Sequence, residues 1–202
     1  MAKHLSSQEN DGRFQRSART RQHLIAAYLD LLRESPKVPT AAELAKRAGC
    51  GVRSVFERFS DLQTLGVAAA DYALRQANAQ AVASDVGGDR QTRIRSQVKT
   101  RAETCERWLP LWRAILRNQH ESAELPPRIE RIREAIVARL ELMYRPELST
   151  LSKADRKALL IALEALTDFE AWGGMRERRG LSVEAAREVW INAIDRLLPP
   201  TP

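Results

Sequence analysis

Arginines and hydroxyl-bearing residues gather in the stretch TAAELAKRAGCGVRSVFERF, residues 40–59. A guanidinium group bonds two acceptors on the edge of a guanine, whereas the hydroxyls of Thr40 and Ser54 and the amides at a helix N-terminus suit phosphate oxygens. Among these residues, Arg53 is the one we expect to contact a base. The stretch therefore indicates recognition of a polyanion.

A second group of basic residues precedes this stretch. The segment RFQRSARTR has arginines at 13, 16, 19 and 21 with no acidic residue between them, and residues 1–66 contain 11 Lys and Arg against 7 Asp and Glu. Neutralising phosphates releases counterions, so such a segment favours DNA. We expect residues 1–18 to form a flexible basic arm, and Arg19 and Arg21 to bind DNA. The alternative is a solvated tail with no partner.

Apolar residues repeat with the helical period along nearly the whole chain, and no stretch alternates in the manner of a strand. The first helix carries the stripe Leu24, Tyr28, Leu31 and Leu32. We expect it to end at Ser35, because Pro36 disfavours helical geometry in the residue before it. Thr40 and Glu43 then form a T-x-x-E capping box for a second helix, which Gly49 ends.

A third and a fourth helix are predicted after the turn at 49–51. The third is short and carries Val55, Phe56 and Phe59, while Asp61 caps a fourth that runs from near Leu62 to about Ser84. Two helices of about eight residues joined by a tight turn have the size of a helix-turn-helix, whose second helix enters the DNA major groove. The residues at the start of that helix are Val52, Arg53 and Ser54.

Two further residues of the short helix have alternative partners. Phe56 is expected to pack against the sugar-phosphate backbone or the first helix. Arg58 lies half a turn from Arg53, so a phosphate contact and an ion pair with Glu57 or Asp61 are both open.

The rest of the chain predicts a separate helical bundle. Residues 90–118 are helical with a break allowed at Pro110, and a long helix follows the prolines at 126 and 127 and runs through Tyr144. Ser152 caps a helix that extends through Trp172, and Ser182 precedes the last helix. The predicted fold class is thus all-α: a three-helix helix-turn-helix domain joined by a fourth helix to a C-terminal bundle, with about nine helices in total.

The run TAAELAKRAGCGVRSVFERFSDLQTL, together with the upstream RTRQHLIAAYLDLL, resembles the DNA-binding domain of the tetracycline-repressor (TetR) family over about residues 19–70. The segment ALEALTDFEAWGGMRERRGLSVEAAREVW resembles the C-terminal helix pair of that family. Three residues depart from its pattern: Gly51 replaces a capping Ser or Thr, Phe56 a common Tyr, and Leu62 a common Lys. These departures shift the expected DNA contacts toward Arg58 and the arm.

The resemblance implies a helix-turn-helix domain over 19–66 and a ligand-sensing and dimerisation domain over 67–202. It also implies a homodimer that binds a palindromic operator in double-stranded DNA, with half-sites about 34–36 Å apart. The last two helices would pair with their copies, and the apolar residues we assign to that interface are Leu159, Leu163, Leu166, Phe169, Trp190, Ile194 and Leu197.

Ligands of the family sit between the middle helices, and the resemblance implies a repressor released by a small effector bound there. Tryptophan faces and few charges among the candidate residues indicate an apolar or aromatic effector. The candidate lining residues are Cys105, Trp108, Trp112, His120, Met143, Tyr144 and Trp172. Ordinary core packing of these residues is the alternative interpretation.

Other classes of protein find little support in the sequence. HExxH, GxSxG, Walker and GxGxxG motifs are absent, the two cysteines are 55 positions apart, and no apolar run approaches the roughly 20 residues of a membrane span. We expect a cytoplasmic protein that is not an enzyme and needs no metal or cofactor. Two alternatives stay open: a ligand-independent architectural DNA-binding protein of the same fold, and a helical enzyme or protein-interaction module that binds no DNA.

Overall fold

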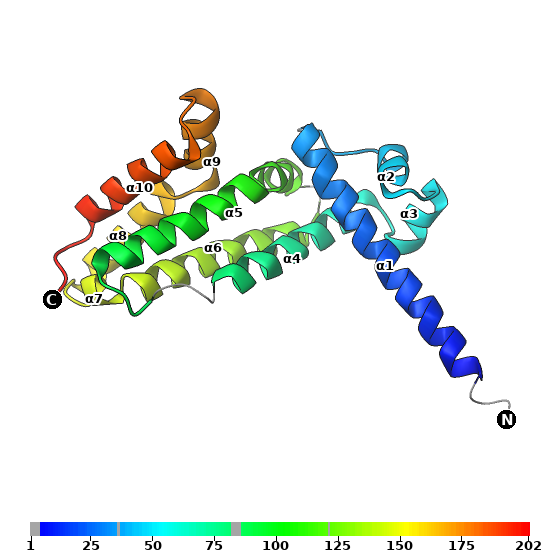
Figure 1. Cartoon of the computed structure of the whole chain (residues 1–202), viewed down its shortest axis with the longest axis horizontal. Helices are drawn as coiled ribbons and strands as arrows, with labels where there is room; N and C mark the ends of the chain where they lie inside the picture. Colours follow the sequence, from blue (N-terminus) through cyan, green and yellow to red (C-terminus); the bar gives the residue numbers. More distant parts are fainter. Residues whose placement is uncertain (1–4, 36, 82–85, 121) are drawn as a thin grey trace. The chain divides into compact units, whose positions relative to one another are not determined.

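A computed structural model of the chain describes residues 5–35, 37–81, 86–120 and 122–202. The residues fall into two compact units, the first made of Met1–Tyr72 and Arg113–Leu125 and the second of Ala73–Trp112 and Pro126–Pro202. Every regular element within the described ranges is helical (Figure 1), which confirms the predicted all-α class. No helix in those ranges is both long enough and apolar enough to cross a membrane.

Three helices form the N-terminal part of the first unit: α1 (Leu5–Glu34), α2 (Ala41–Ala48) and α3 (Val52–Arg58). Each of them packs on the other two, and Figure 1 shows α2 and α3 beside α1. Their shared core contains the buried side chains Leu24, Tyr28, Leu32, Leu44, Val55 and Phe59. Because α1 already begins at Leu5, most of the predicted arm has helical backbone, and its flexibility stays a prediction.

Local hydrogen bonds fix the ends of these helices where the sequence predicted them. The amide of Glu43 donates to the Thr40 hydroxyl at 3.3 Å, and the amide of Thr40 donates to the Glu43 carboxylate at 2.8 Å, which completes the capping box. These bonds hold the pKa of Glu43 below its usual value. Gly49 ends α2 with a left-handed φ of 67°, a conformation that glycine adopts without steric cost.

Helix α4 (Leu62–Ala81) follows directly. Asp61 caps it, accepting a bond of 2.7 Å from the amide of Thr64. The helix passes close to α1 at Gly66, where a Cβ atom would lie 3.3 Å from the Tyr28 hydroxyl. The predicted end near Ser84 lies outside the described residues.

The remaining long helices are α5 (Arg90–Asn118), α6 (Leu125–Met143), α8 (Lys153–Leu166) and α10 (Val183–Leu197), with the single turn α7 (Arg145–Leu148) after α6. Helix α5 continues through Pro110, where the sequence allows a break. Pro126 and Pro127 lie in the first turn of α6, where a missing N–H costs nothing. Ser152 caps α8 as predicted, and Ser182, which the sequence places before the last helix, caps α10.

One predicted helix is wrong in its extent. The helix expected to run from Ser152 through Trp172 ends at Leu166, because Asp168 adopts an extended conformation and caps a new helix, α9 (Phe169–Gly173). A π-helical segment, η1 (Gly174–Arg178), then leads to the turn before α10. Apolar spacing alone did not reveal this interruption, since Leu163, Leu166, Phe169 and Trp172 follow one another at intervals of three residues, as they would in a continuous helix.

The capping box makes a testable contribution to stability. Replacing Thr40→Ala should lower the free energy of unfolding by about 1 kcal/mol, because the amide of Glu43 loses its acceptor. The matched control Thr40→Ser keeps the hydroxyl and should stay close to wild type. Urea denaturation measures both, and an Ala variant as stable as the Ser variant would contradict the assigned cap.

Candidate functional site

The tight turn between α2 and α3 sets the direction of the short helix α3. The amide of Cys50 donates to the carbonyl of Ala45 at 3.0 Å, which folds the chain back over the end of α2. Gly51 stands at the N-cap of α3 in an extended conformation and provides no side-chain hydrogen bond, as predicted. A Cβ atom at Gly51 would meet nothing within 4 Å. The weak cap is therefore a property of this sequence and not a steric requirement.

Helix α3 has one buried and one exposed face. Val55 and Phe59, at 1% and 2% exposure, anchor it in the core as predicted. The opposite face presents Val52, Arg53 and Phe56, with 92% of the Arg53 side chain exposed. Ser54 is half-buried between the two faces. The start of α3 thus offers a cation flanked by two apolar side chains to a partner.

Arg53 and Arg58 both pair with Glu57. The Nε atom of Arg53 lies 3.1 Å from one carboxylate oxygen of Glu57, and Nη1 of Arg58 lies 3.9 Å from the other. Exposed pairs of this kind contribute at most about 1 kcal/mol, so an incoming acceptor can replace them. Of the two alternatives predicted for Arg58, the ion pair with Glu57 is present, whereas a phosphate contact stays a prediction.

Arg21 has partners inside the chain that the sequence did not reveal. Its Nη1 donates to the backbone carbonyl of Arg58 at 3.0 Å, and its guanidinium lies 4.2 Å from the ring centroid of Phe59. The carbonyls at a helix C-terminus carry partial negative charge, which a cation stabilises. Arg21 therefore secures the C-terminal end of α3 to α1. Its predicted contact with DNA is not tested by these bonds, and neither is that of the exposed Arg19.

Thr40 also has an internal role. Its hydroxyl donates to the Glu43 carboxylate at 2.8 Å while it accepts from the Glu43 amide. A phosphate at this position would have to compete with that carboxylate for the hydroxyl proton.

The residues predicted to line a ligand pocket are mostly core. Cys105, Trp108, Trp112, Met143, Tyr144 and Trp172 are all buried, whereas His120 is exposed. Trp112 stacks on Phe169 with ring centroids 5.0 Å apart, and Trp172 packs on Trp190 at 4.7 Å. Burial also raises the pKa of Cys105 to about 12, so this thiol stays protonated and unreactive at neutral pH.

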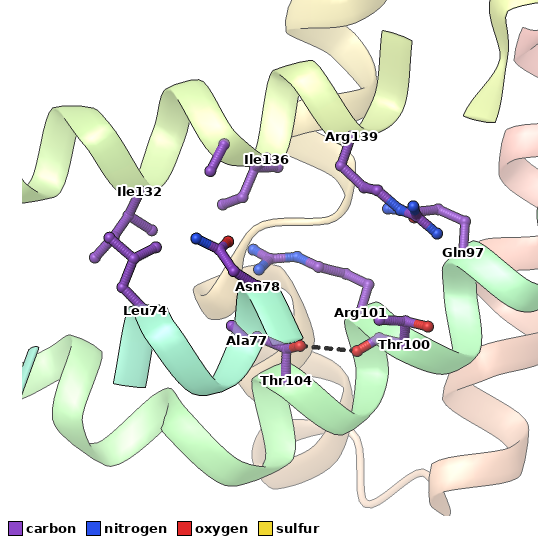
Figure 2. Close-up of a pocket in the computed structure, with 11 residues that line it drawn as sticks. Leu74, Ala77, Asn78, Gln97, Thr100, Arg101, Thr104, Ile132, Ile136 and Arg139 are labelled. Atoms are coloured by element: carbon purple, nitrogen blue, oxygen red, sulfur yellow. Dashed lines mark hydrogen bonds between the residues drawn. The ribbon is translucent and has the colours of Figure 1, made fainter. Parts of the chain in front are cut away.

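A cavity of about 80 Å³ lies instead between α4, α5 and α6 within the second unit. None of the seven residues predicted to bind a ligand lines it. Its apolar wall consists of Leu74, Ala77, Ile132, Ala135 and Ile136. Its polar wall consists of Asn78, Gln97, Thr100, Arg101, Thr104 and Arg139. Figure 2 shows Leu74 and Ile132 at one end and Gln97 and Arg139 at the other.

The chain shares its architecture with solved transcriptional regulators. It matches a regulator from Rhodococcus sp. Rha1 with a TM-score of 0.71 and 20% identity over 90% of this chain and 99% of that one. A TetR-family regulator from Streptomyces coelicolor matches with a TM-score of 0.69 and 17% identity, over 89% of this chain and 80% of that one. The multidrug-binding protein EbrR, complexed with malachite green, matches with a TM-score of 0.56 and 18% identity, over 89% and 98%.

The chain has the TetR fold. The resemblance read from residues 19–70 and from the C-terminal helix pair is thereby confirmed for the fold. No protein-family model and no curated protein matches the sequence. Within this TetR fold, α2 and α3 are the helix-turn-helix.

The sequence did not identify the polar wall of the cavity, although a signal was present. The stripe of α5 that includes Ile94, Val98, Cys105 and Trp108 has Arg101 at one of its core positions, and Arg101 is only 6% exposed. A charged residue in the apolar stripe of a helix is unusual. Packing alone therefore does not explain why an arginine occupies this position.

The contacts of Arg21 predict a loss of stability when its guanidinium is removed. Arg21→Met should lower the free energy of unfolding by about 1–2 kcal/mol, because α3 loses both the bond to its last carbonyl and the contact with Phe59. Arg19→Met is the matched control on the same helix and should leave stability unchanged. Thermal and urea denaturation compare the two, and equal stability of both variants would contradict the role assigned to Arg21.

Proposed function

We propose that the chain is a DNA-binding transcriptional regulator that acts in the cytoplasm as a homodimeric repressor. The observation that carries the proposal is the start of α3, where 92% of the Arg53 side chain is exposed on the second helix of a helix-turn-helix. The TetR fold supports the proposal, because several of its solved examples are transcriptional regulators. Double-stranded DNA with a palindromic operator is the partner that two such helices fit.

Arg53 is the residue that we expect to read a base. In the free protein its Nε donates to the exposed Glu57 carboxylate. Because such an exposed ion pair contributes little free energy, the guanidinium group can exchange it for the O6 and N7 atoms of a guanine at low cost. Val52 and Phe56 flank it with apolar surface that suits the methyl group of thymine and the sugar-phosphate backbone. Ser54, Arg58 and the exposed Arg19 would add phosphate contacts that position the helix.

Replacing Arg53→Ala should reduce the preference for the operator over random DNA by about 5- to 150-fold, the value of one bidentate contact with a base. Fluorescence anisotropy with fragments selected from the source genome measures that preference. Arg133→Ala, which removes an exposed arginine of α6 and the same charge, should leave it unchanged. Arg19→Ala should instead weaken binding to all sequences alike and lower the salt slope by about one unit.

If the wild-type chain binds no genomic fragment, the regulator is excluded and a helical enzyme or protein-interaction module is favoured. If the Arg53 variant keeps the full preference, another residue reads the operator.

The homodimer would use α8 and α10, which pack on each other. Of the seven residues predicted for this interface, Leu163, Phe169, Trp190 and Ile194 are buried inside the chain itself. Since buried side chains offer no surface to a partner, the interface must use other residues of the two helices. The large apolar side chains exposed there are Ile161, Val189 and Leu197, at 57%, 46% and 46% exposure. Exposed alanines, among them Ala158 and Ala185, extend the surface.

An acidic residue in this surface should separate the protomers. Val189→Asp is expected to raise the dimer dissociation constant by about 100-fold or more, because an unpaired charge buried in an interface costs about 3–5 kcal/mol. Val86→Asp is the control, since it places the same charge on an exposed apolar residue outside the two helices. Analytical ultracentrifugation gives the mass, and a Val189 variant that stays dimeric would show that the surface is not the interface.

A small effector would release the repressor by shifting its conformational equilibrium. EbrR, which has the same fold, is known in complex with malachite green. In this chain Leu74, Ala77 and Asn78 of α4 line the cavity, and the same helix starts at Leu62, four residues after α3. A ligand that moves α4 would therefore alter how α3 is held. The alternative of a ligand-independent architectural protein of the same fold stays open.

A further inference from the structure

The cavity between α4, α5 and α6 has an unusual charge balance. Two arginines, Arg101 and Arg139, contribute to the wall, and none of the eleven described lining residues is an aspartate or a glutamate. Arg101 is 6% exposed, and the neighbouring Gln97 is 4% exposed. A cation with so little contact with water, in a wall that contains no acidic residue, is unfavourable unless hydrogen bonds or a negative charge offset its burial.

The contacts of Arg101 hold its side chain in place without neutralising it. Its Nε donates to the backbone carbonyl of Thr167 at 2.8 Å, and its guanidinium lies 4.5 Å from the ring centroid of Phe169. In Figure 2 the side chain extends from α5 across the space between the helices, with the guanidinium directed toward Asn78. A pre-positioned guanidinium needs no ordering when a ligand arrives, which favours affinity.

Arg93 provides a comparison on the same helix. It lies eight residues before Arg101 and is buried to the same degree, but it pairs with the fully buried carboxylate of Glu147. The hydroxyl of Thr201 donates to that carboxylate at 2.6 Å. The fold therefore supplies an internal anion to Arg93, whereas the residues that line the cavity supply none to Arg101.

The other end of the polar wall also carries oriented donors. Arg139 donates from Nε to the Gln97 side-chain oxygen at 3.2 Å, which orients both groups at the same edge of the cavity. Partial burial lowers the pKa of Arg139. Because a partly buried guanidinium is less screened by water, it attracts an anion more strongly than an exposed one does. Opposite this edge, Leu74 and Ile132 form an apolar end (Figure 2).

We propose that this cavity binds a small organic acid, whose carboxylate is held by Arg101, with Arg139 as a second cation at the other end of the polar wall, and whose short apolar body lies against Leu74 and Ile132. The planar fork of arginine matches the two oxygens of a carboxylate. The proposal rests on the proposed function and narrows it, because it replaces an apolar effector by an amphipathic anion. The volume of about 80 Å³ is well below the roughly 300–1,000 Å³ of common ligand pockets, so the acid is short.

The test uses the full-length protein and four probes: hexanoate, benzoate, and their uncharged counterparts hexanamide and benzamide. Isothermal titration calorimetry should show that at least one acid binds and that its amide binds about 10- to 100-fold more weakly, since charge-assisted hydrogen bonds are lost. Inorganic phosphate, which lacks an apolar body, should bind more weakly than the acid.

Variants locate the binding site. Arg101→Met and Arg139→Gln should each weaken the binding of the acid by about tenfold or more. Leu74→Trp should block binding, because the larger side chain fills the apolar end of the cavity. Arg133→Met, which removes an exposed arginine of the same α6, should change nothing. Circular dichroism verifies the fold of each variant, and Arg139→Gln, at a half-exposed position, covers the case in which Arg101→Met does not fold.

Failure of the inference is distinct from failure of the proposed function, because operator binding is measured separately by anisotropy. If neither acid binds at millimolar concentration, or acid and amide bind equally, the inference is wrong even when the operator is bound. If the acid binds equally well to Arg101→Met and Arg139→Gln, the site lies elsewhere and the inference is again wrong. Acid binding that both substitutions weaken supports it.

Discussion

Helix α3, which we propose as the recognition helix, is only seven residues long, which is too short for a helix to be stable in water by itself. Its conformation therefore depends on what it packs against. Val55 and Phe59 anchor it in the core of the first unit, and Arg21 of α1 binds its last carbonyl. Because these contacts leave the other face unoccupied, Arg53 can stand almost fully in solvent on a rigid base. The proposed DNA interface thus depends on the packing behind α3 as much as on the residues in front.

Helix α4 imposes a second constraint, because the same helix contacts α1 and lines the cavity. Its first turn is held by the Asp61 cap and by the close approach of Gly66 to Tyr28, while Leu74 and Ala77 line the cavity. The cap and the Tyr28 contact belong to the first unit and the cavity to the second, and α4 runs through both. The alanine-rich sequence between these points contains no proline that would favour a break. The proposed control of DNA binding by a ligand uses this continuity of α4.

The sequence predicted those parts of the fold that local chemistry determines. The Thr40 capping box, the end of α2 at Gly49 and the Ser152 cap each depend on residues a few positions apart, and all are present. The residues of the proposed dimer interface on α8 and α10 were harder to predict, because the burial of a side chain depends on which face of its helix packs against the rest of the chain. Trp190 lies on the apolar stripe of α10, but the Trp172 ring that packs on it belongs to another helix, α9. For the same reason the internal contacts of Arg21 could not be foreseen.

Arg101 shows how a residue that violates the pattern carries functional information. Its place in the stripe of α5 would be filled more favourably by an apolar residue, since replacing a buried charge by well-packed apolar groups is often neutral or stabilising. The bond to the Thr167 carbonyl and the contact with the Phe169 ring of α9 reduce the cost of burial but carry no negative charge. Arg93 on the same helix shows that this fold can place a carboxylate beside a buried arginine when only stability is needed. Among its described residues, the cavity wall provides Arg101 with no such carboxylate, and the proposed organic acid would supply one.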